Sequence, residues 1–131
     1  MLKFGTICFL RYLRGILMLH IHQFGLLAEY LVMIRYMLKG YLPINHRYKS
    51  KIGEIDLIFK RGSSIIFCEV KARSGLYDIE NIVSKAQKAR ILRAADFFLA
   101  KNQNMDIQHV ELNLAVVKSL FDIKIYRNWL T

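Results

Sequence analysis

Two apolar runs separated by a short turn constrain the fold of this chain more than any other feature. The runs span Gly53–Lys60 and Ser64–Ala72, and Arg61–Ser63 divides them. Both are rich in β-branched, aromatic and large aliphatic side chains, which suit a pleated and largely buried strand. The pattern predicts a β-hairpin around which the other elements must pack.

Charged side chains interrupt this apolar hairpin at regular positions. Alternate side chains of a strand point to the same face, so Glu54 and Asp56 project together, as do Glu69 and Lys71. Two carboxylates on neighbouring strands repel each other unless a cation or a proton lies between them. The same residues also fit a solvated sheet face with an ordinary Glu54–Lys71 ion pair, which adds little stability.

The length of the turn decides whether these groups share a face. A four-residue connection pairs Lys60 with Ile65 and sets Asp56 opposite Glu69, whereas a two-residue connection sets Glu54 opposite Glu69. Both even lengths keep the charged groups on one face, and a three-residue connection divides them between two faces. A joint site therefore requires an even connection.

Paired carboxylates of this kind suit a hard divalent cation. Mg²⁺ or Mn²⁺ binds carboxylate oxygens and keeps several positions for water or phosphate oxygens. A nearby Lys71 would orient or help to deprotonate an attacking water, or neutralise charge that develops on phosphorus. Asp56, Glu69 and Lys71 are thus candidate catalytic residues for metal-assisted phosphodiester hydrolysis.

The flanking sequence indicates helices before and after the hairpin. Apolar residues spaced three and four apart predict helices over Gly25–Lys39 and Ile79–Lys101. Between the first helix and the hairpin, Tyr41–Tyr48 is expected to be irregular or a short strand because Pro43 restricts pairing. Further short strands are predicted over Val110–Val117 and Asp122–Tyr126. The order α-β-β-α-β-β predicts an α/β fold with a mixed sheet flanked by helices.

The charge balance favours polyanionic partners. Twenty Lys and Arg residues stand against ten Asp and Glu, which gives a formal net charge of +10. Nucleic acid, and DNA in particular, is the partner expected of such a basic chain with candidate nuclease residues. Arg47, Lys49 and Lys51 precede the hairpin, and Lys85 and Lys88 lie in the long helix, where they would track a phosphate backbone.

Residues 1–23 form an apolar, basic leader ahead of a domain over residues 24–131. The longest stretch without formal charge, Gly15–Ala28, is short for a spanning helix, and no signal-peptide cleavage site is evident. Peripheral membrane contact through this basic segment is the alternative interpretation, and a misassigned upstream start would also explain the leader. Cys8 and Cys68 have no disulfide or metal spacing, so a cytoplasmic location is expected.

The hairpin resembles the signature of the YraN-like bacterial proteins, GEIDLI followed by FVEVKxR. Here Gly53–Ile58 reads GEIDLI and Phe67–Arg73 reads FCEVKAR. The resemblance extends over roughly Phe24–Trp129. It implies a restriction-endonuclease-like fold of the PD-(D/E)xK superfamily, distantly similar to archaeal Holliday-junction resolvases. Branched DNA is then a candidate substrate.

The resemblance also implies roles for single residues. Asp56 and Glu69 would hold Mg²⁺ or Mn²⁺, with the backbone carbonyl of Val70 as a third ligand and Glu29 as a further ligand through water. Lys71 would be the catalytic lysine. Arg73 from the motif joins the candidate nucleic-acid contacts.

The sequence departs from the family pattern at three places, of which one is the leader before Phe24, longer and more apolar than the short polar start of the family. Gln87 stands where a lysine is expected in the long helix, and it is retained as a candidate nucleic-acid contact beside Lys85 and Lys88. An Arg-x-Asp pair expected in the next strand reads Glu111-Leu112-Asn113 here.

Two function classes therefore compete with membrane binding. One is a Mg²⁺-dependent endonuclease, and the other is a nucleic-acid-binding module of nuclease fold without hydrolysis. No phosphate-cradling glycine loop is present, so no small-molecule cofactor is expected. A homodimer is compatible with the sequence.

Overall fold

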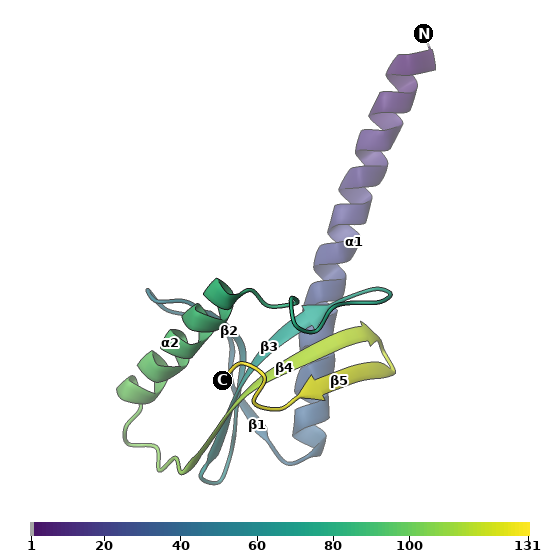
Figure 1. Ribbon diagram of the computed structural model, residues 1–131. Coiled ribbons are helices and arrows are strands. Elements are labelled where there is room, and N and C mark those ends of the chain that lie inside the picture. The colour runs from purple at the N-terminus through teal and green to yellow at the C-terminus, as the bar shows by residue number, and fades with distance from the viewer. Residues whose placement is uncertain (1) are drawn as a thin grey trace.

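The computed structural model describes the backbone of residues 2–131 and the side chains of residues 9–11, 13–14 and 24–131 (Figure 1). In these residues the elements follow one another as α1 (Leu2–Leu38), β1 (Leu42–Lys49), β2 (Glu54–Arg61), β3 (Ser64–Ala72), α2 (Lys85–Lys101), β4 (His109–Ser119) and β5 (Asp122–Tyr126). The five strands form one sheet in the order β1-β2-β3-β4-β5. The β3–β4 pair is parallel, since α2 carries the chain back between these strands, and the other pairs are antiparallel. The predicted α/β fold with a mixed sheet flanked by helices is confirmed.

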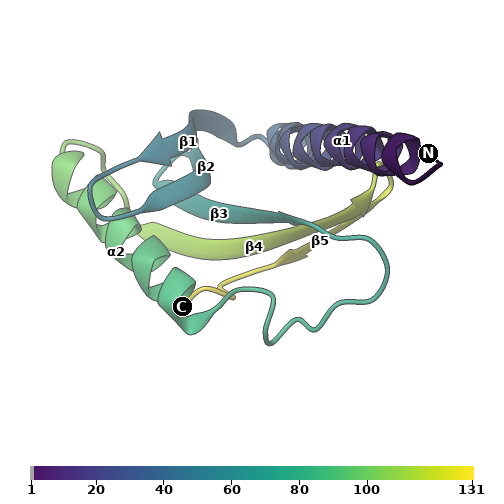
Figure 2. The same ribbon diagram turned by 90° about the horizontal axis from the view of Figure 1, so that it is seen from above.

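The two helices cover opposite faces of the sheet, which Figure 2 shows from above. Side chains alternate along β3, so Cys68 packs beneath α1 whereas Phe67 packs beneath α2. The α1 side of the core includes Val32 and Tyr36, and the α2 side includes Phe98. The sheet is thus buried on both faces, which explains the nearly continuous apolar runs of β2 and β3.

Helix α1 is longer than the predicted Gly25–Lys39 and begins at Leu2. Its C-terminal part packs on the sheet through Ala28, Val32 and Tyr36, whose spacing of four places them on one helical face. The N-terminal part projects past the sheet (Figure 1), so the expected boundary between residues 23 and 24 falls inside one continuous helix. In the part of the chain that the structure describes, no helix combines the length and apolar character needed to cross a bilayer.

Helix α2 begins at Lys85 rather than at Ile79, where apolar spacing placed its start. The Ser84 hydroxyl accepts a hydrogen bond from the backbone N–H of Gln87 at 3.1 Å and caps the helix. Ile79 and Ile82 still pack on the core, but from the irregular segment before the cap. The spacing of these apolar residues indicated that they are buried, but not that they are helical. The Ser-x-x-Gln pattern indicated the helix start more accurately than the apolar spacing did.

Strand β1 adds a third strand before α2, in the region Tyr41–Tyr48, where an irregular segment or a short strand was expected. It pairs with β2 at the edge of the sheet, with a register shift between Pro43 and Asn45. The missing N–H of Pro43 is tolerated in an edge strand, because such a strand forms backbone hydrogen bonds with a neighbouring strand on one side only. The observed order is therefore α-β-β-β-α-β-β.

The hairpin has the register that the four-residue connection predicts. Lys60 pairs with Ile65 and Arg61 with Ser64, around a tight turn in which Gly62 adopts a φ of 58°. This positive φ favours glycine. The paired residues end at Leu57 and Cys68, one position before Asp56 and Glu69. Strand β2 continues its pairing on the other side, where Glu54 lies opposite Lys49 of β1.

Candidate functional site

Asp56 lies one residue beyond the last backbone pair between β2 and β3, and its carboxylate binds the backbone of β3 there. The Oδ2 atom accepts a hydrogen bond from the backbone N–H of Val70 at 2.8 Å. Burial raises the pKa of Asp56, and the charge of Glu29 adds to this, while the Val70 N–H opposes it. The side chain is thus fixed against β3 in a position where its negative charge is costly.

Glu69 is the buried acid of the site, with 7% of its surface exposed. Its Oε1 atom accepts a hydrogen bond from Nε2 of Gln87 at 3.1 Å and lies 3.6 Å from Nζ of Lys71. Burial and then the charge of Asp56 raise the pKa of Glu69 to about 8, although the Lys71 ammonium acts in the opposite direction. One nearby ammonium therefore does not neutralise both acids.

These groups line a cavity of about 290 Å³ between the hairpin and α2. The lining residues are Gly53, Glu54, Asp56, Glu69, Gln87, Arg90 and Ile91. Gly53 allows the turn before β2 to approach the helix, because a Cβ there would lie 3.0 Å from the carbonyl oxygen of Arg90. Asp56 and Glu69 consequently face the same space, as the even connection requires.

The donor set fits a magnesium-type ion. Asp56 and Glu69 supply two buried carboxylates whose mutual repulsion a cation would relieve, and the cavity leaves room for water. In the described part of the chain, no three His, Cys, Asp or Glu side chains are grouped to hold a metal. Mg²⁺ commonly binds through one or two carboxylates and completes its shell with water and phosphate oxygens, so two acids suffice.

Glu29 lies on α1 near this pair but has protein partners of its own. Its Oε2 atom accepts a hydrogen bond from Nε of Arg47 at 3.0 Å and lies 3.2 Å from Nε2 of His46. Arg47 reaches this position with a φ of 56°, a strained backbone for a non-glycine residue. The influence of Glu29 on the pKa of Asp56 places its charge near the site, and its role as a ligand through water stays a prediction.

The candidate nucleic-acid contacts differ in exposure and in the groups that they contact. Lys49, Lys51 and Lys85 are exposed, whereas Gln87 points into the cavity and bonds Glu69. Other cations are engaged by the protein: Arg47 by Glu29, Arg73 by the carbonyl of Ala72 at 2.8 Å, and Lys88 by the ring of Trp129 at 4.9 Å. Gln87 therefore contacts the acid site, a role that its position in a helix did not reveal.

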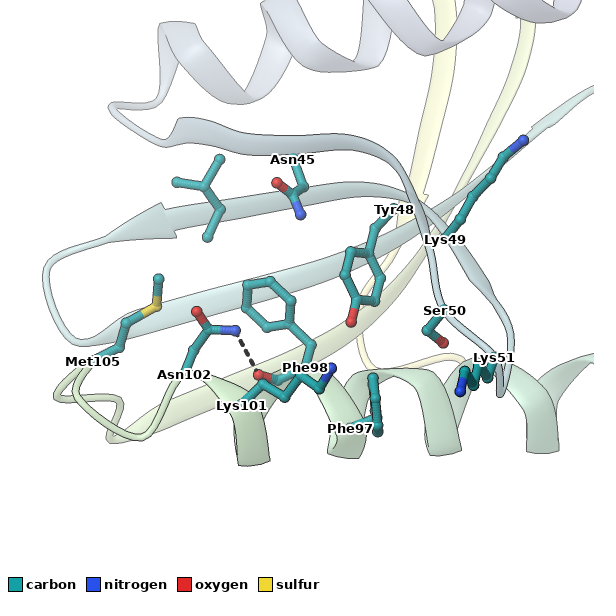
Figure 3. Close-up of a pocket in the computed structure, with 11 residues that line it drawn as sticks. Asn45, Tyr48, Lys49, Ser50, Lys51, Phe97, Phe98, Lys101, Asn102 and Met105 are labelled. Carbon is teal, nitrogen blue, oxygen red and sulfur yellow. Dashed lines mark hydrogen bonds between the residues drawn. The ribbon is translucent and has the colours of Figure 1, made fainter.

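A second and larger hollow was not predicted from the sequence. It measures about 1040 Å³ and lies between β1 and the C-terminal half of α2 (Figure 3). Its walls come from segments far apart in the chain, so no local motif marks it. The clustered aromatic residues at Tyr48 and at Phe97-Phe98 were the available signal.

The strand that departs from the family pattern holds a complete polar network instead. Glu111 forms an ion pair with Arg127, and the buried Asn113 donates to Glu111 and to the hydroxyl of Tyr36. The side-chain Oδ1 atom of Asn113 accepts a hydrogen bond from the backbone N–H of Asn128 at 2.9 Å. These contacts lie beneath α1, so they support the sheet rather than the acid cavity.

The chain matches the protein family described as "Uncharacterised protein family UPF0102" over residues 28–123. A UPF0102 protein of Methylorubrum populi is 44% identical over 82 residues, which are 63% of this chain and 66% of that protein. A UPF0102 protein of Maricaulis maris is 36% identical over 93 residues, 71% of this chain and 73% of that protein. One of Bartonella tribocorum is 38% identical over 93 residues, 71% of this chain and 72% of that protein.

The chain covers slightly less than two thirds of the length of the Methylorubrum relatives. The matched region contains β1 to β4, α2 and all residues that line the acid cavity, but leaves out most of α1. The resemblance to YraN-like proteins that the hairpin indicates is confirmed, and this chain belongs to the uncharacterised protein family UPF0102.

Proposed function

We propose that this chain binds DNA and hydrolyses its phosphodiester bonds with Mg²⁺ or Mn²⁺ held by Asp56 and Glu69. One observation carries the proposal. Two carboxylates from adjacent strands share a cavity, each with a raised pKa, and a lysine ammonium lies 3.6 Å from one of them. Burying like charges together is costly, and a ligand that carries positive charge would stabilise the pair.

The bound cation would lower the pKa of a coordinated water and polarise the phosphate. Asp56 is held in place by the Val70 N–H and Glu69 by the Gln87 amide, so both acids are oriented before an ion arrives. Val70 follows Glu69 in β3, and its backbone carbonyl is the candidate third ligand.

Lys71 extends from the same strand as Glu69 and is partly exposed, so a phosphate outside the cavity can reach its ammonium. There it orients the attacking water and neutralises charge on phosphorus. The water oxygen forms a bond to phosphorus as the bond to the leaving sugar oxygen breaks, and that oxygen takes up a proton. The products are one phosphate monoester end and one hydroxyl end.

The test is cleavage of labelled duplex, single-stranded and four-way-junction DNA by the full chain, with Mg²⁺ or Mn²⁺ against EDTA. Cleavage is expected only with the divalent ion. Lys71→Ala is expected to lower the rate by about 100-fold or more, in the range for loss of a proton-transfer or charge-stabilising group. Lys124→Ala, which removes an exposed lysine on β5, is the matched control and should cleave normally.

Two results would contradict the proposal. Cleavage that persists in EDTA or in Lys71→Ala would show that another site, or a contaminant, is responsible. Salt-sensitive DNA binding that survives Asp56→Ala, without product under either metal, would instead support a non-catalytic nucleic-acid-binding module.

A further inference from the structure

The large hollow between β1 and α2 combines aromatic walls with a basic rim. Tyr48 of β1 and Phe98 of α2 pack edge to face in its wall, with ring centroids 5.3 Å apart and planes at 88° (Figure 3). Phe97 also lines the hollow, is half-buried, and belongs to neither core cluster. Its ring is therefore available at the wall of the groove without being part of the packing that holds the fold together.

The charged residues that line this groove have one sign. Its lining contains Lys49, Lys51 and Lys101 but no acidic residue. Lys101 places its ammonium 4.5 Å from the centre of the Phe97 ring, so a cation and an aromatic face are presented together. Lys51 lies at the opposite end of the groove, in the turn between β1 and β2.

This groove continues toward the acid cavity. The turn between β1 and β2 contributes Ser50 and Lys51 to the groove and Gly53 to the cavity. Helix α2 likewise contributes Gln87 to the cavity and, further along, Phe97 to the groove. The two sites therefore follow one another along the same wall, and an extended chain of phosphates can contact both.

We propose that this groove binds an unpaired segment of DNA and leads it to the acid cavity, which makes single-stranded or single-strand-flanked DNA the substrate class. The inference rests on the proposed function for its biological meaning. Lysines along a groove neutralise phosphates, and aromatic rings contact base faces, which are free only in an unpaired strand. A hollow of about 1040 Å³ is slightly larger than small-ligand pockets, which measure about 300–1,000 Å³, so it has room for an extended ligand.

The test is binding of a fluorescent oligo-dT strand by the full chain in EDTA, where hydrolysis cannot occur. Phe97→Ala is expected to weaken binding at least about fivefold, the lower range for loss of one base–aromatic contact. Lys51→Ala combined with Lys101→Ala should lower the slope of log affinity against log salt by about 0.7 per lysine. Circular dichroism and thermal melting check that each variant is folded.

Matched controls lie at the other end of the molecule. Phe121→Ala removes a phenylalanine that is 98% exposed in the β4–β5 turn, and Lys124→Ala removes an exposed lysine of β5. Both should bind oligo-dT like the unmodified chain. A blunt duplex of equal length should bind more weakly and be insensitive to Phe97→Ala.

The inference fails if folded Phe97→Ala binds oligo-dT normally. It also fails if blunt duplex binds the unmodified chain as tightly as oligo-dT does and loses as much affinity on Phe97→Ala. This failure is separable from failure of the proposed function, which concerns cleavage with a divalent ion. Oligo-dT binding is measured in EDTA, so its outcome does not depend on whether the acid site hydrolyses DNA.

Discussion

Asp56→Asn is expected to stabilise the metal-free protein at alkaline pH while abolishing its response to Mg²⁺. The substitution removes one of two buried negative charges but keeps an oxygen that can accept the hydrogen bond from Val70. Its main effect is therefore electrostatic. The charge of Asp56 is the second cause, after burial, of the raised pKa of Glu69.

The sign of the pH dependence follows from proton binding. Glu69 has its ordinary pKa of 4.5 in the unfolded chain and a pKa of about 8 in the folded chain. Between these values only the folded chain holds the proton, so the free energy of unfolding falls as pH rises from 4.5 to about 8 and then levels off. Below pH 4.5 both states are protonated and the contribution is fully present.

The magnitude can be bounded. Each pH unit in this window costs about 1.4 kcal/mol, so the ceiling for Glu69 is about 5 kcal/mol. Burial is the larger cause, and we assign about 1–2 kcal/mol to the charge of Asp56. Asp56→Asn should then raise the melting temperature at pH 9 by about 3–8 °C and change it little at pH 4.

Thermal unfolding between pH 4 and pH 9, with EDTA or with Mg²⁺, measures both effects. A hundredfold excess of Mg²⁺ over its dissociation constant should stabilise the unmodified chain by about 2.7 kcal/mol and Asp56→Asn not at all. Asp96→Asn, which removes an exposed acid of α2, is the matched control and should keep the Mg²⁺ response. Equal stabilisation of Asp56→Asn and the unmodified chain by Mg²⁺ would refute the reasoning. So would a melting temperature of Asp56→Asn that differs from that of the unmodified chain by the same amount at pH 9 and at pH 4.

Three further substitutions test contacts that support the acid site or the sheet. Gln87→Ala removes the donor to Glu69 and should reduce metal affinity or cleavage by about 10–100-fold with little change in melting temperature, and normal cleavage would show that Gln87 does not position the acid. Gly53→Ala places a methyl group 3.0 Å from the carbonyl oxygen of Arg90 and should cost about 1–3 kcal/mol in urea unfolding, so an unchanged midpoint would contradict the close approach. Asn113→Ala breaks a buried amide network and should cost about 1–3 kcal/mol in the same experiment, whereas cleavage per folded molecule should stay normal.

The strands with strong local patterns were predictable from the sequence. The bounds of β3 and β5 agree with the predicted Ser64–Ala72 and Asp122–Tyr126, because β-branched and aromatic residues fill these segments between clear turns. Helix α2 was predicted too long because Ile79 and Ile82 keep helical spacing although they pack from an irregular segment. Such spacing reports burial, and the cap at Ser84 reports the helix start.

Strand β1 and the N-terminal part of α1 show a second limit. Pro43 argues against a central strand but permits an edge strand, and only the sheet order distinguishes the two. Helix α1 is continuous through the segment that was interpreted as a leader. No helix start signal therefore exists near Gly25, where apolar spacing placed the beginning of the helix.

The acid pair could be predicted because strand alternation and turn length fix which side chains meet. Asp56, Glu69 and Lys71 follow from counting along one hairpin. The partners from other elements could not be counted in this way. Three features depend on how α1 and α2 are placed against the sheet. They are the hydrogen bond from Gln87 to Glu69, the hydrogen bond from Arg47 to Glu29 and the groove lined by Phe97.

Anomalous X-ray scattering from a crystal soaked in Mn²⁺ tests the proposed metal site most directly. One strong Mn²⁺ peak is expected between the carboxylates of Asp56 and Glu69 in the cavity beside α2, with the Lys71 ammonium nearby. The peak should vanish in a crystal of Asp56→Asn. A Mn²⁺-free cavity at saturating metal, or a peak that persists without the Asp56 carboxylate, would contradict the account.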